Sequence, residues 1–328
     1  MSADLRTRAA GIGLKNPVLA GSGEATMSAE GIRAALAAGA AAVVAKSTNE
    51  SEAAKRQLRD ADYVLLDEHL RPLPWGPAPR SASLFCRSGL VDEPWERWVE
   101  LLAQLDGEAR QRDAYVVPSL IVADPDEAVS RARELEQAGL RWLELNVAAP
   151  HGEEAVPGAI RTDIKLVAPI REAVSLPLTV KVRPDQVAAA VAAGTDAVCL
   201  TTRPLGFVPD PETRRPLLGT FAAIGGAWAL PITLRHVAKA RARFGPELSI
   251  IGTNGAREGL DVVRFLLAGA SAVQLTSAVM TDGPGAIARA LAELERYLER
   301  QDATVAKLVG EAADAVLTYE EAAIERRH

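Results

Sequence analysis

The stretch LLAGASAVQLTS, residues 266–277, contains the pattern that decides the fold. A helical segment ends at Ala268-Gly269, and a short apolar run follows that finishes in two hydroxyl side chains. A glycine at this place is typical of a helix C-terminus, where the backbone turns into the left-handed conformation. The apolar run hardly alternates with polar residues, which predicts a strand buried on both faces. One such unit therefore indicates a parallel sheet covered by helices.

The same pattern occurs three more times along the chain: ALAAGAAAVVAKS at 35–47, ELEQAGLRWLELN at 134–146 and VAAGTDAVCLTT at 191–202. Between these units lie further strand candidates, at 16–23, 115–122, 177–182 and 248–254. Strands that alternate with amphipathic helices, without a linker rich in Pro or Ser, favour one (β/α)₈ barrel over a doubly wound protein of two domains. We therefore expect an α/β fold, a single TIM barrel.

Two insertions interrupt this alternation. Residues 49–90 are too long and too rich in proline for a simple crossover, which predicts a lid or a small β-excursion near the site. Residues 203–230 are expected to form a long loop on the active face. We expect residues 1–300 to form the barrel and residues 301–328 a C-terminal helical extension, packed across the barrel or against a second subunit.

The composition limits the classes of partner. The 37 basic and 43 acidic residues give a formal charge of −6, and no basic run indicates a nucleic acid or an anionic membrane as a partner. The N-terminus lacks the apolar core of a signal peptide, and no later window is apolar over ~18 residues, so we expect a cytoplasmic protein. The cysteines Cys86 and Cys199 and the four histidines show no ligand spacing, so no metal site is predicted and an iron–sulfur cluster would belong to another chain.

Function in a barrel collects where strands end, and several of these ends carry groups that suit a cofactor. Small residues follow the first strand, and Lys46-Ser47 follow the second. Lys181 lies in an otherwise apolar strand, and a glycine loop and a hydroxyl pair follow the last two strands. Each feature alone is compatible with an ordinary turn or a lysine reaching solvent. Together they favour a flavin mononucleotide (FMN) site, in which Lys181 would stabilise the reduced ring near its N1–O2 edge.

Several segments, among them GLKNPVLAGSG, LTVKV and IIGTNGAREGLDVVRFLLAGASAVQLTSA, resemble class 1 dihydroorotate dehydrogenases, which are FMN enzymes on a (β/α)₈ barrel. The resemblance extends from residue 5 to residue 298 and implies at least a dimer. It also implies a set of FMN contacts, which are Ala20, Gly21, Lys46, Ser47, Asn146, Lys181, Gly225, Gly226, Asn254, Gly255, Thr276 and Ser277.

The substrate side departs from that family. The family's loop after the central strand reads Asn-x-Ser-Cys-Pro-Asn, with Cys or Ser as the base, whereas this chain has NVAAPH at 146–151. Ala149 therefore stands where the base would be, and Cys86, Arg203 and His151 stand at or next to the positions of amides that grip the pyrimidine. Each unmatched buried polar group costs ~1–3 kcal/mol. We therefore expect a substrate other than dihydroorotate.

Three side chains could act in place of the missing groups. His151 has an imidazole with an ordinary pKa of ~6.5 and could serve as a base, although it could equally be a surface histidine. Arg87 and Arg203 could together hold a carboxylate or phosphate, or could be solvated charges. Cys86 is a weaker candidate for a base.

Three other residues are expected to have structural roles. Cys199 is predicted in the core, and Trp95 and Trp98 are expected in the core or at an interface.

Three functions remain open at this point. The first is an FMN-dependent oxidoreductase that acts on a small anionic substrate other than dihydroorotate. The second is a flavin-binding protein without catalysis of its own, which would relay electrons beside an electron-transfer flavoprotein or iron–sulfur subunit. The third is dihydroorotate oxidation with His151 as the base. A homodimer is expected in each case.

Overall fold

A parallel sheet closes on itself in the computed structural model, which describes residues 3–58, 61–121, 124–149 and 163–325. Its hydrogen-bonded order is β8-β4-β3-β18-β17-β12-β11-β10-β9. The first and last strands in that order are two halves of one segment, divided at Pro118, which has no N–H to donate. The sheet is therefore an eight-stranded barrel, as predicted. Its strands are β3 (Val18–Ala20), β4 (Ala42–Val44), β8 (Tyr115–Val117), β9 (Ser119–Leu120), β10 (Leu143–Asn146), β11 (Leu178–Lys181), β12 (Ala197–Leu200), β17 (Ser249–Gly252) and β18 (Ala272–Leu275).

The barrel strands are buried on both faces because one face meets the helices and the other fills the barrel. Leu19, Trp142, Cys199 and Ile251 belong to a buried cluster of residues on or next to the barrel strands and the N-terminal hairpin, while Val18 and Leu145 belong to the larger core shared with the helices. Cys199 is fully buried, which confirms its prediction as a core residue, and burial raises the pKa of its thiol.

The four helix–glycine–strand units have the expected geometry. Their glycines, Gly39, Gly139, Gly194 and Gly269, have φ values of 102°, 83°, 85° and 107°. The helices before these glycines are α1 (Ala29–Ala37), α4 (Pro125–Gln137), α6 (Val187–Ala192) and α8 (Gly259–Leu267). Each chain reversal leads directly into a barrel strand, so the sequence pattern located four strands correctly.

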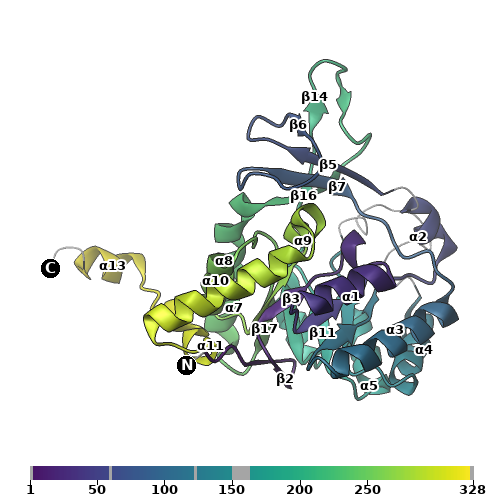
Figure 1. Ribbon diagram of the computed structural model, residues 1–328, viewed down its shortest axis with the longest axis horizontal. Coiled ribbons are helices and arrows are strands. Elements are labelled where there is room, and N and C mark those ends of the chain that lie inside the picture. Colours follow the sequence, from purple (N-terminus) through teal and green to yellow (C-terminus); the bar gives the residue numbers. More distant parts are fainter. Residues whose placement is uncertain (1–2, 59–60, 122–123, 150–162, 326–328) are drawn as a thin grey trace.

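Among the residues that the structure describes, six further α-helices come before the C-terminal segment (Figure 1). They are α2 (Glu52–Gln57), α3 (Trp95–Arg110), α5 (Val167–Ala173), α7 (Leu230–Phe244), α9 (Ser277–Asp282) and α10 (Gly285–Gln301). In α3 the residues Trp98, Leu102, Leu105 and Ala109 recur at helical spacing and are buried, so one face of this helix packs on the barrel. This confirms the expected core position of Trp98.

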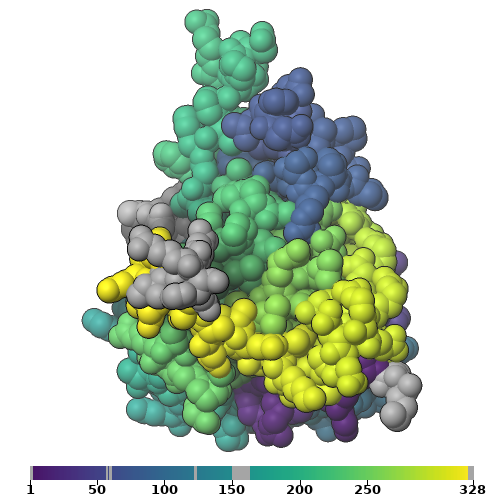
Figure 2. Space-filling model, turned by 90° about the vertical axis from the view of Figure 1, so that its left-hand side faces the viewer, coloured from purple at the N-terminus to yellow at the C-terminus, as the bar shows by residue number. Residues whose placement is uncertain are grey.

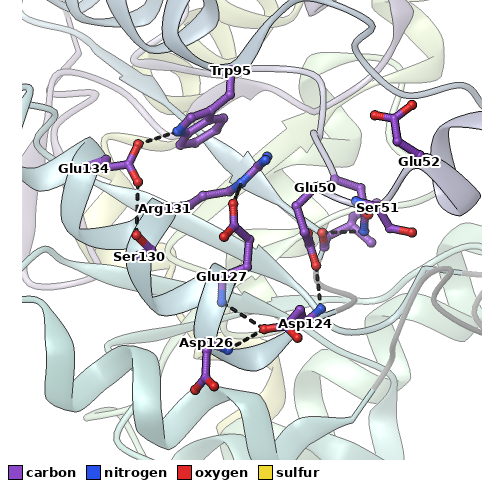
Figure 3. Close-up of polar contacts among 12 residues, drawn as sticks. Glu50, Ser51, Glu52, Trp95, Asp124, Asp126, Glu127, Ser130, Arg131 and Glu134 are labelled. Carbon is purple, nitrogen blue, oxygen red and sulfur yellow. Dashed lines mark hydrogen bonds and ion pairs between the residues drawn. The ribbon is translucent and has the colours of Figure 1, made fainter.

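Side-chain contacts join α3, α4 and the loop after β4 (Figure 3). The indole nitrogen of Trp95 donates to Glu134 at 2.6 Å, and the Arg131 guanidinium lies 4.5 Å from the Trp95 ring centroid. Asp124 caps α4 by accepting from the backbone of Asp126 and Glu127, and its own N–H donates to Glu50. These contacts fix the start of α4 against the loop that leaves β4.

Both insertions contribute to one antiparallel sheet, in the order β13-β16-β7-β5-β6. Its strands are β5 (Asp62–Leu66), β6 (Pro72–Leu73), β7 (Ser83–Arg87), β13 (Leu205–Gly206) and β16 (Ala222–Gly226), and a short hairpin of β14 (Pro209–Asp210) and β15 (Arg215–Pro216) extends from it. Figures 1 and 2 show the blue and green segments standing together above the barrel. The β-excursion predicted for the first insertion is confirmed, whereas the second insertion, expected as a loop, also forms strands.

The two chain ends lie away from this sheet. A hairpin of β1 (Thr7–Ala9) and β2 (Ile12–Leu14) covers the N-terminal ends of the last two barrel strands, where Thr7 donates to the carbonyl of Ser271. At the other end, α11 (Val305–Leu308) and α12 (Glu311–Asp314) pack on α7 and α8, and α13 (Tyr319–Glu325) projects from the body (Figure 1). Within the described residues, no helix is long and apolar enough to cross a membrane.

Candidate active site

A cavity of about 1020 Å³, counted out to where it opens to solvent, lies at the C-terminal ends of the barrel strands. This is the end at which TIM-barrel enzymes place their chemistry. Ten of the predicted site residues line it: Lys46, Ser47, Asn146, Lys181, Arg203, Gly225, Asn254, Gly255, Thr276 and Ser277. Four do not: Ala20, Gly21, Gly226 and Arg87. His151 lies outside the described residues.

Lys46 enters the cavity with a carboxylate partner. Its ammonium donates to Glu24 at 2.6 Å, and Glu24, in the short turn η1 (Glu24–Thr26), also accepts from the backbone N–H of Gly89 at 3.1 Å. Burial lowers the pKa of Lys46, and the Glu24 carboxylate opposes that shift. The pair therefore places a buried lysine beside a carboxylate at the cavity, and through Gly89 it ties the end of the antiparallel excursion to the barrel.

Lys181 and Asn146 lie side by side because β10 and β11 pair in parallel with these two residues in register. The Asn146 side-chain oxygen accepts from the backbone N–H of Ala148 at 3.1 Å. That bond turns the loop after β10 and leaves the amide nitrogen of Asn146 for other partners. A cation and an amide thus occupy neighbouring strand ends in the cavity.

The ends of β17 and β18 form a tight corner of backbone and hydroxyl groups. Asn254 and Gly255 both have positive φ, 72° and 105°. A Cβ at Gly255 would lie 2.7 Å from backbone atoms of Leu230, so no other residue fits there without movement of the chain. Thr276 and Ser277 follow β18 and face the same cavity. The corner offers backbone N–H and hydroxyl donors, which suit an anion.

Arg203 connects the cavity to the antiparallel sheet. Its guanidinium donates to the sulfur of Cys86 at 2.7 Å and to the hydroxyl of Ser88 at 3.1 Å. Arg87 follows Cys86 on β7 but does not line the cavity, and its buried Nε has no partner among the described residues. The structure therefore brings Arg203 into the cavity without Arg87, and it pairs Cys86 with Arg203 rather than with its neighbour in sequence.

One side of the cavity is apolar. Leu58, Ile121 and Ala149 line it and are 6%, 6% and 5% exposed, and Ala54 and Leu90 complete their buried cluster. Ile121 is held by two bonds to the loop after β4, since its N–H donates to the carbonyl of Thr48 and its carbonyl accepts from Asn49. We call Leu58, Ile121 and Ala149 the apolar wall.

A family model described as "Dihydroorotate dehydrogenase" matches residues 80–298. The chain belongs to this family. The resemblance to class 1 members noted in the sequence is thereby confirmed, and dihydroorotate dehydrogenases are oxidoreductases.

Curated relatives agree with this assignment. The chain is 31% identical over 308 residues to the "Dihydroorotate dehydrogenase B (NAD(+)), catalytic subunit" of Desulforudis audaxviator, covering 89% of this chain and 92% of that protein. The protein of the same name from Methanothermobacter thermautotrophicus is 28% identical over 327 residues, 94% of this chain and 99% of its own length. A third, from Methanopyrus kandleri, is 36% identical over 193 residues, 54% of this chain and 61% of that protein.

Some lining residues escaped the sequence analysis. Leu58 and Ile121 lie in stretches without a recognisable motif, so no local signal marked them. Gln274 interrupts the apolar run of β18, and its partner Glu144, which does not line the cavity, interrupts that of β10. Both are polar side chains inside a buried strand, the signal that Lys181 also carries, so both could have been found from the sequence.

Proposed function

We propose that this protein is an FMN-dependent oxidoreductase that acts on a small anionic substrate other than dihydroorotate. When bound, the flavin would supply the acceptor or donor of two electrons. The protein would supply the cations, the hydrogen bonds and the shaped wall that orient the substrate.

The described residues fit such a cofactor. A buried acceptor oxygen of Gln274, which lines the cavity, has no partner among the described residues and is therefore available to a ligand. A Cβ at Gly225 would lie 3.0 Å from both Arg203 and Asn254, so a side chain at this position would crowd the cavity. By family analogy, Lys181 and Asn146 would meet the ring, and the corner at Asn254 and Thr276 would hold the phosphate.

The observation that carries the choice of substrate is the apolar wall at Ala149. The family's base would occupy this position, and the side chains around it are Leu58, Leu90 and Ile121. A polar dihydropyrimidine ring would lose hydrogen bonds to water here without gaining partners from these described side chains. The wall suits a substrate whose surface on this side is apolar.

Arg203 supports the anionic part of the proposal. A guanidinium has five N–H donors, and two of its nitrogens already bond to Cys86 and Ser88. Those bonds hold the planar group in one orientation at the cavity, and the remaining N–H groups can meet a carboxylate or phosphate.

The test begins with purified protein reconstituted with FMN. Anaerobic mixing with millimolar dihydroorotate should leave the flavin absorbance unchanged, and a panel of small carboxylates and organic phosphates should include one that bleaches it. Arg203→Lys keeps the charge but loses the planar fork, and it should raise the KM for that substrate far more than it changes FMN affinity. Protein that takes up no FMN, or that is reduced rapidly by dihydroorotate, would refute the proposal.

The electron acceptor is a second element of the proposal. Three relatives carry the name of a catalytic subunit linked to NAD(+). We infer that this chain passes electrons to a separate electron-transfer flavoprotein or iron–sulfur subunit. Homodimer formation, a cytoplasmic location and the role of His151 remain predictions from the sequence; unchanged turnover in His151→Ala would remove His151 as the base.

A further inference from the structure

A row of hydrogen bonds at the cavity connects residues that lie on, or shortly after, five of the barrel strands. The hydroxyls of Ser22 and Ser47 lie 3.4 Å apart, and those of Ser47 and Ser119 lie 2.9 Å apart. Ser119 donates to one oxygen of Glu144 at 3.3 Å, and the amide nitrogen of Gln274 donates to the other at 2.7 Å. We call these five residues the floor network. Ser22, Ser47 and Gln274 also line the cavity.

Glu144 decides which way the Gln274 amide faces. The carboxylate is 1% exposed and accepts on both oxygens, so the amide must present its N–H₂ group to it. The reverse orientation would set two acceptor oxygens against each other. The Gln274 oxygen is therefore turned away from Glu144.

That oxygen is buried and has no partner among the described residues, although Gln274 is only 1% exposed. It lies 3.1 Å from the point that a Cβ of Gly21 would occupy, and the Thr276 hydroxyl lies 2.1 Å from the same point, so a side chain at Gly21 would collide with both. Nearly all buried polar groups in proteins are paired, and an unpaired acceptor is costly. The oxygen is thus an unmatched acceptor on a residue that lines the cavity.

We propose that the Gln274 oxygen accepts a hydrogen bond from the bound flavin, and that Glu144 is the positioning residue that fixes this acceptor. The inference rests on the proposed FMN site. An acceptor repels a carboxylate or phosphate, so the group above the floor network is an N–H or O–H donor. The oxidised flavin offers two sources, its single ring N–H at N3 and the hydroxyls of its ribityl chain.

The experiment compares three flavins on the apoprotein by fluorescence titration: FMN, 3-methyl-FMN, and an FMN analogue whose side chain carries the phosphate but no hydroxyls. The wild-type protein should bind one analogue about tenfold more weakly than FMN, the loss expected for one unmatched buried hydrogen bond. Loss with 3-methyl-FMN identifies the ring N–H as donor, and loss with the other analogue identifies the ribityl chain.

Variants then assign that discrimination to Gln274. In Gln274→Met, the affinity for the analogue that the wild-type protein binds weakly should come to within about twofold of the affinity for FMN. The exchange of both residues, Glu144→Gln with Gln274→Glu, keeps the pair and an acceptor oxygen, so it should restore the discrimination. Thr48→Val is the matched control, because the Thr48 hydroxyl is also buried without a partner in the described part of the chain but does not line the cavity.

Two results would overturn the inference. If the ratio of the affinity for FMN to that for each analogue is the same in the wild-type protein and in Gln274→Met, the oxygen meets no flavin donor. The proposed function would survive that result. Failure of the wild-type protein to bind FMN would overturn the proposed function together with this inference. If Gln274→Met does not fold, the variant that exchanges both residues, Glu144→Gln with Gln274→Glu, still tests the role of the acceptor oxygen.

Discussion

The buried pair of Lys46 and Glu24 allows a stability prediction with a defined pH dependence. Glu24→Gln removes the carboxylate that lies 2.6 Å from the Lys46 ammonium, and Lys46 is 5% exposed. Removal of one partner from a buried ion pair costs roughly 3–5 kcal/mol. We expect a loss of about 3 kcal/mol in the free energy of unfolding at pH 7, at the lower end because the new amide oxygen can still accept from Lys46 and Gly89.

The sign of the pH effect follows from the pKa of Lys46. Burial lowers it in the folded protein, and Glu24→Gln removes the group that opposes the shift. Between the lowered folded pKa and the unfolded value of ~10.4, the unfolded chain binds more protons, so stability rises with pH by up to ~1.4 kcal/mol per unit. The folded pKa of Lys46 should be lower in Glu24→Gln than in the wild-type protein, so as the pH rises the variant releases this proton first, and its deficit should shrink through the interval between the two folded pKa values.

Urea unfolding followed by tryptophan fluorescence measures the effect. The double variant Glu24→Gln with Lys46→Met removes both charges and should be more stable than Glu24→Gln alone. Glu108→Gln is the matched control, because its pair with Arg33 has similar distances but both side chains are over a third exposed. A deficit equal to that of Glu108→Gln, or one that does not change with pH, would refute the argument.

Three further predictions concern the cavity. Lys181→Ala should slow flavin reduction more than it weakens FMN binding; equal losses in stopped-flow and titration experiments would argue against a role at the ring. Gly255→Ala should cost at least about 2–3 kcal/mol in urea unfolding and weaken FMN binding, because strain at positive φ adds to the clash with Leu230, whereas Gly11→Ala, strained but unobstructed, should cost about 1–2 kcal/mol. Ala149→Ser should destabilise by about 1–3 kcal/mol by placing a hydroxyl in the apolar wall, and it should not create dihydroorotate oxidation; flavin bleaching by dihydroorotate would contradict this.

The barrel could be predicted from the sequence because its signals are local. The helix, the glycine at positive φ and the buried strand follow one another within about a dozen residues, a range in which backbone preference and burial act together. Pairing of the two insertions could not be predicted in this way. Ala223 opposes Cys86 although the two are 137 positions apart in the sequence, and short strands of mixed composition carry no mark of their partners.

In the candidate site, too, residues with a local signal could be predicted and contacts between distant segments could not. Lys46 and Lys181 were predictable because a charge inside an apolar strand or directly after it is expensive to bury and therefore conspicuous. Arg203 was noticed, but its partner was not, since 117 residues separate it from Cys86. The neighbouring Arg87 was the natural choice from the sequence, yet successive side chains on a strand point to opposite faces. Only the fold could show that the guanidinium reaching Cys86 comes from the far insertion.

The changes around the proposed substrate site lie outside the barrel strands. Most residues proposed to hold the cofactor lie on or directly after barrel strands, where the closed sheet fixes their positions, whereas Gly225 and Gly226 lie on β16 of the antiparallel sheet. The departures from the family occur at Ala149, Cys86 and Arg203, in the loop after β10, on the antiparallel sheet and in the loop that leads to it. There Arg203 donates to Cys86 and Ser88, and Ala149 joins an apolar cluster, whereas the buried Nε of Arg87 has no partner among the described residues. The contact of Arg203 with Cys86 and the packing of Ala149 support the substrate site proposed above.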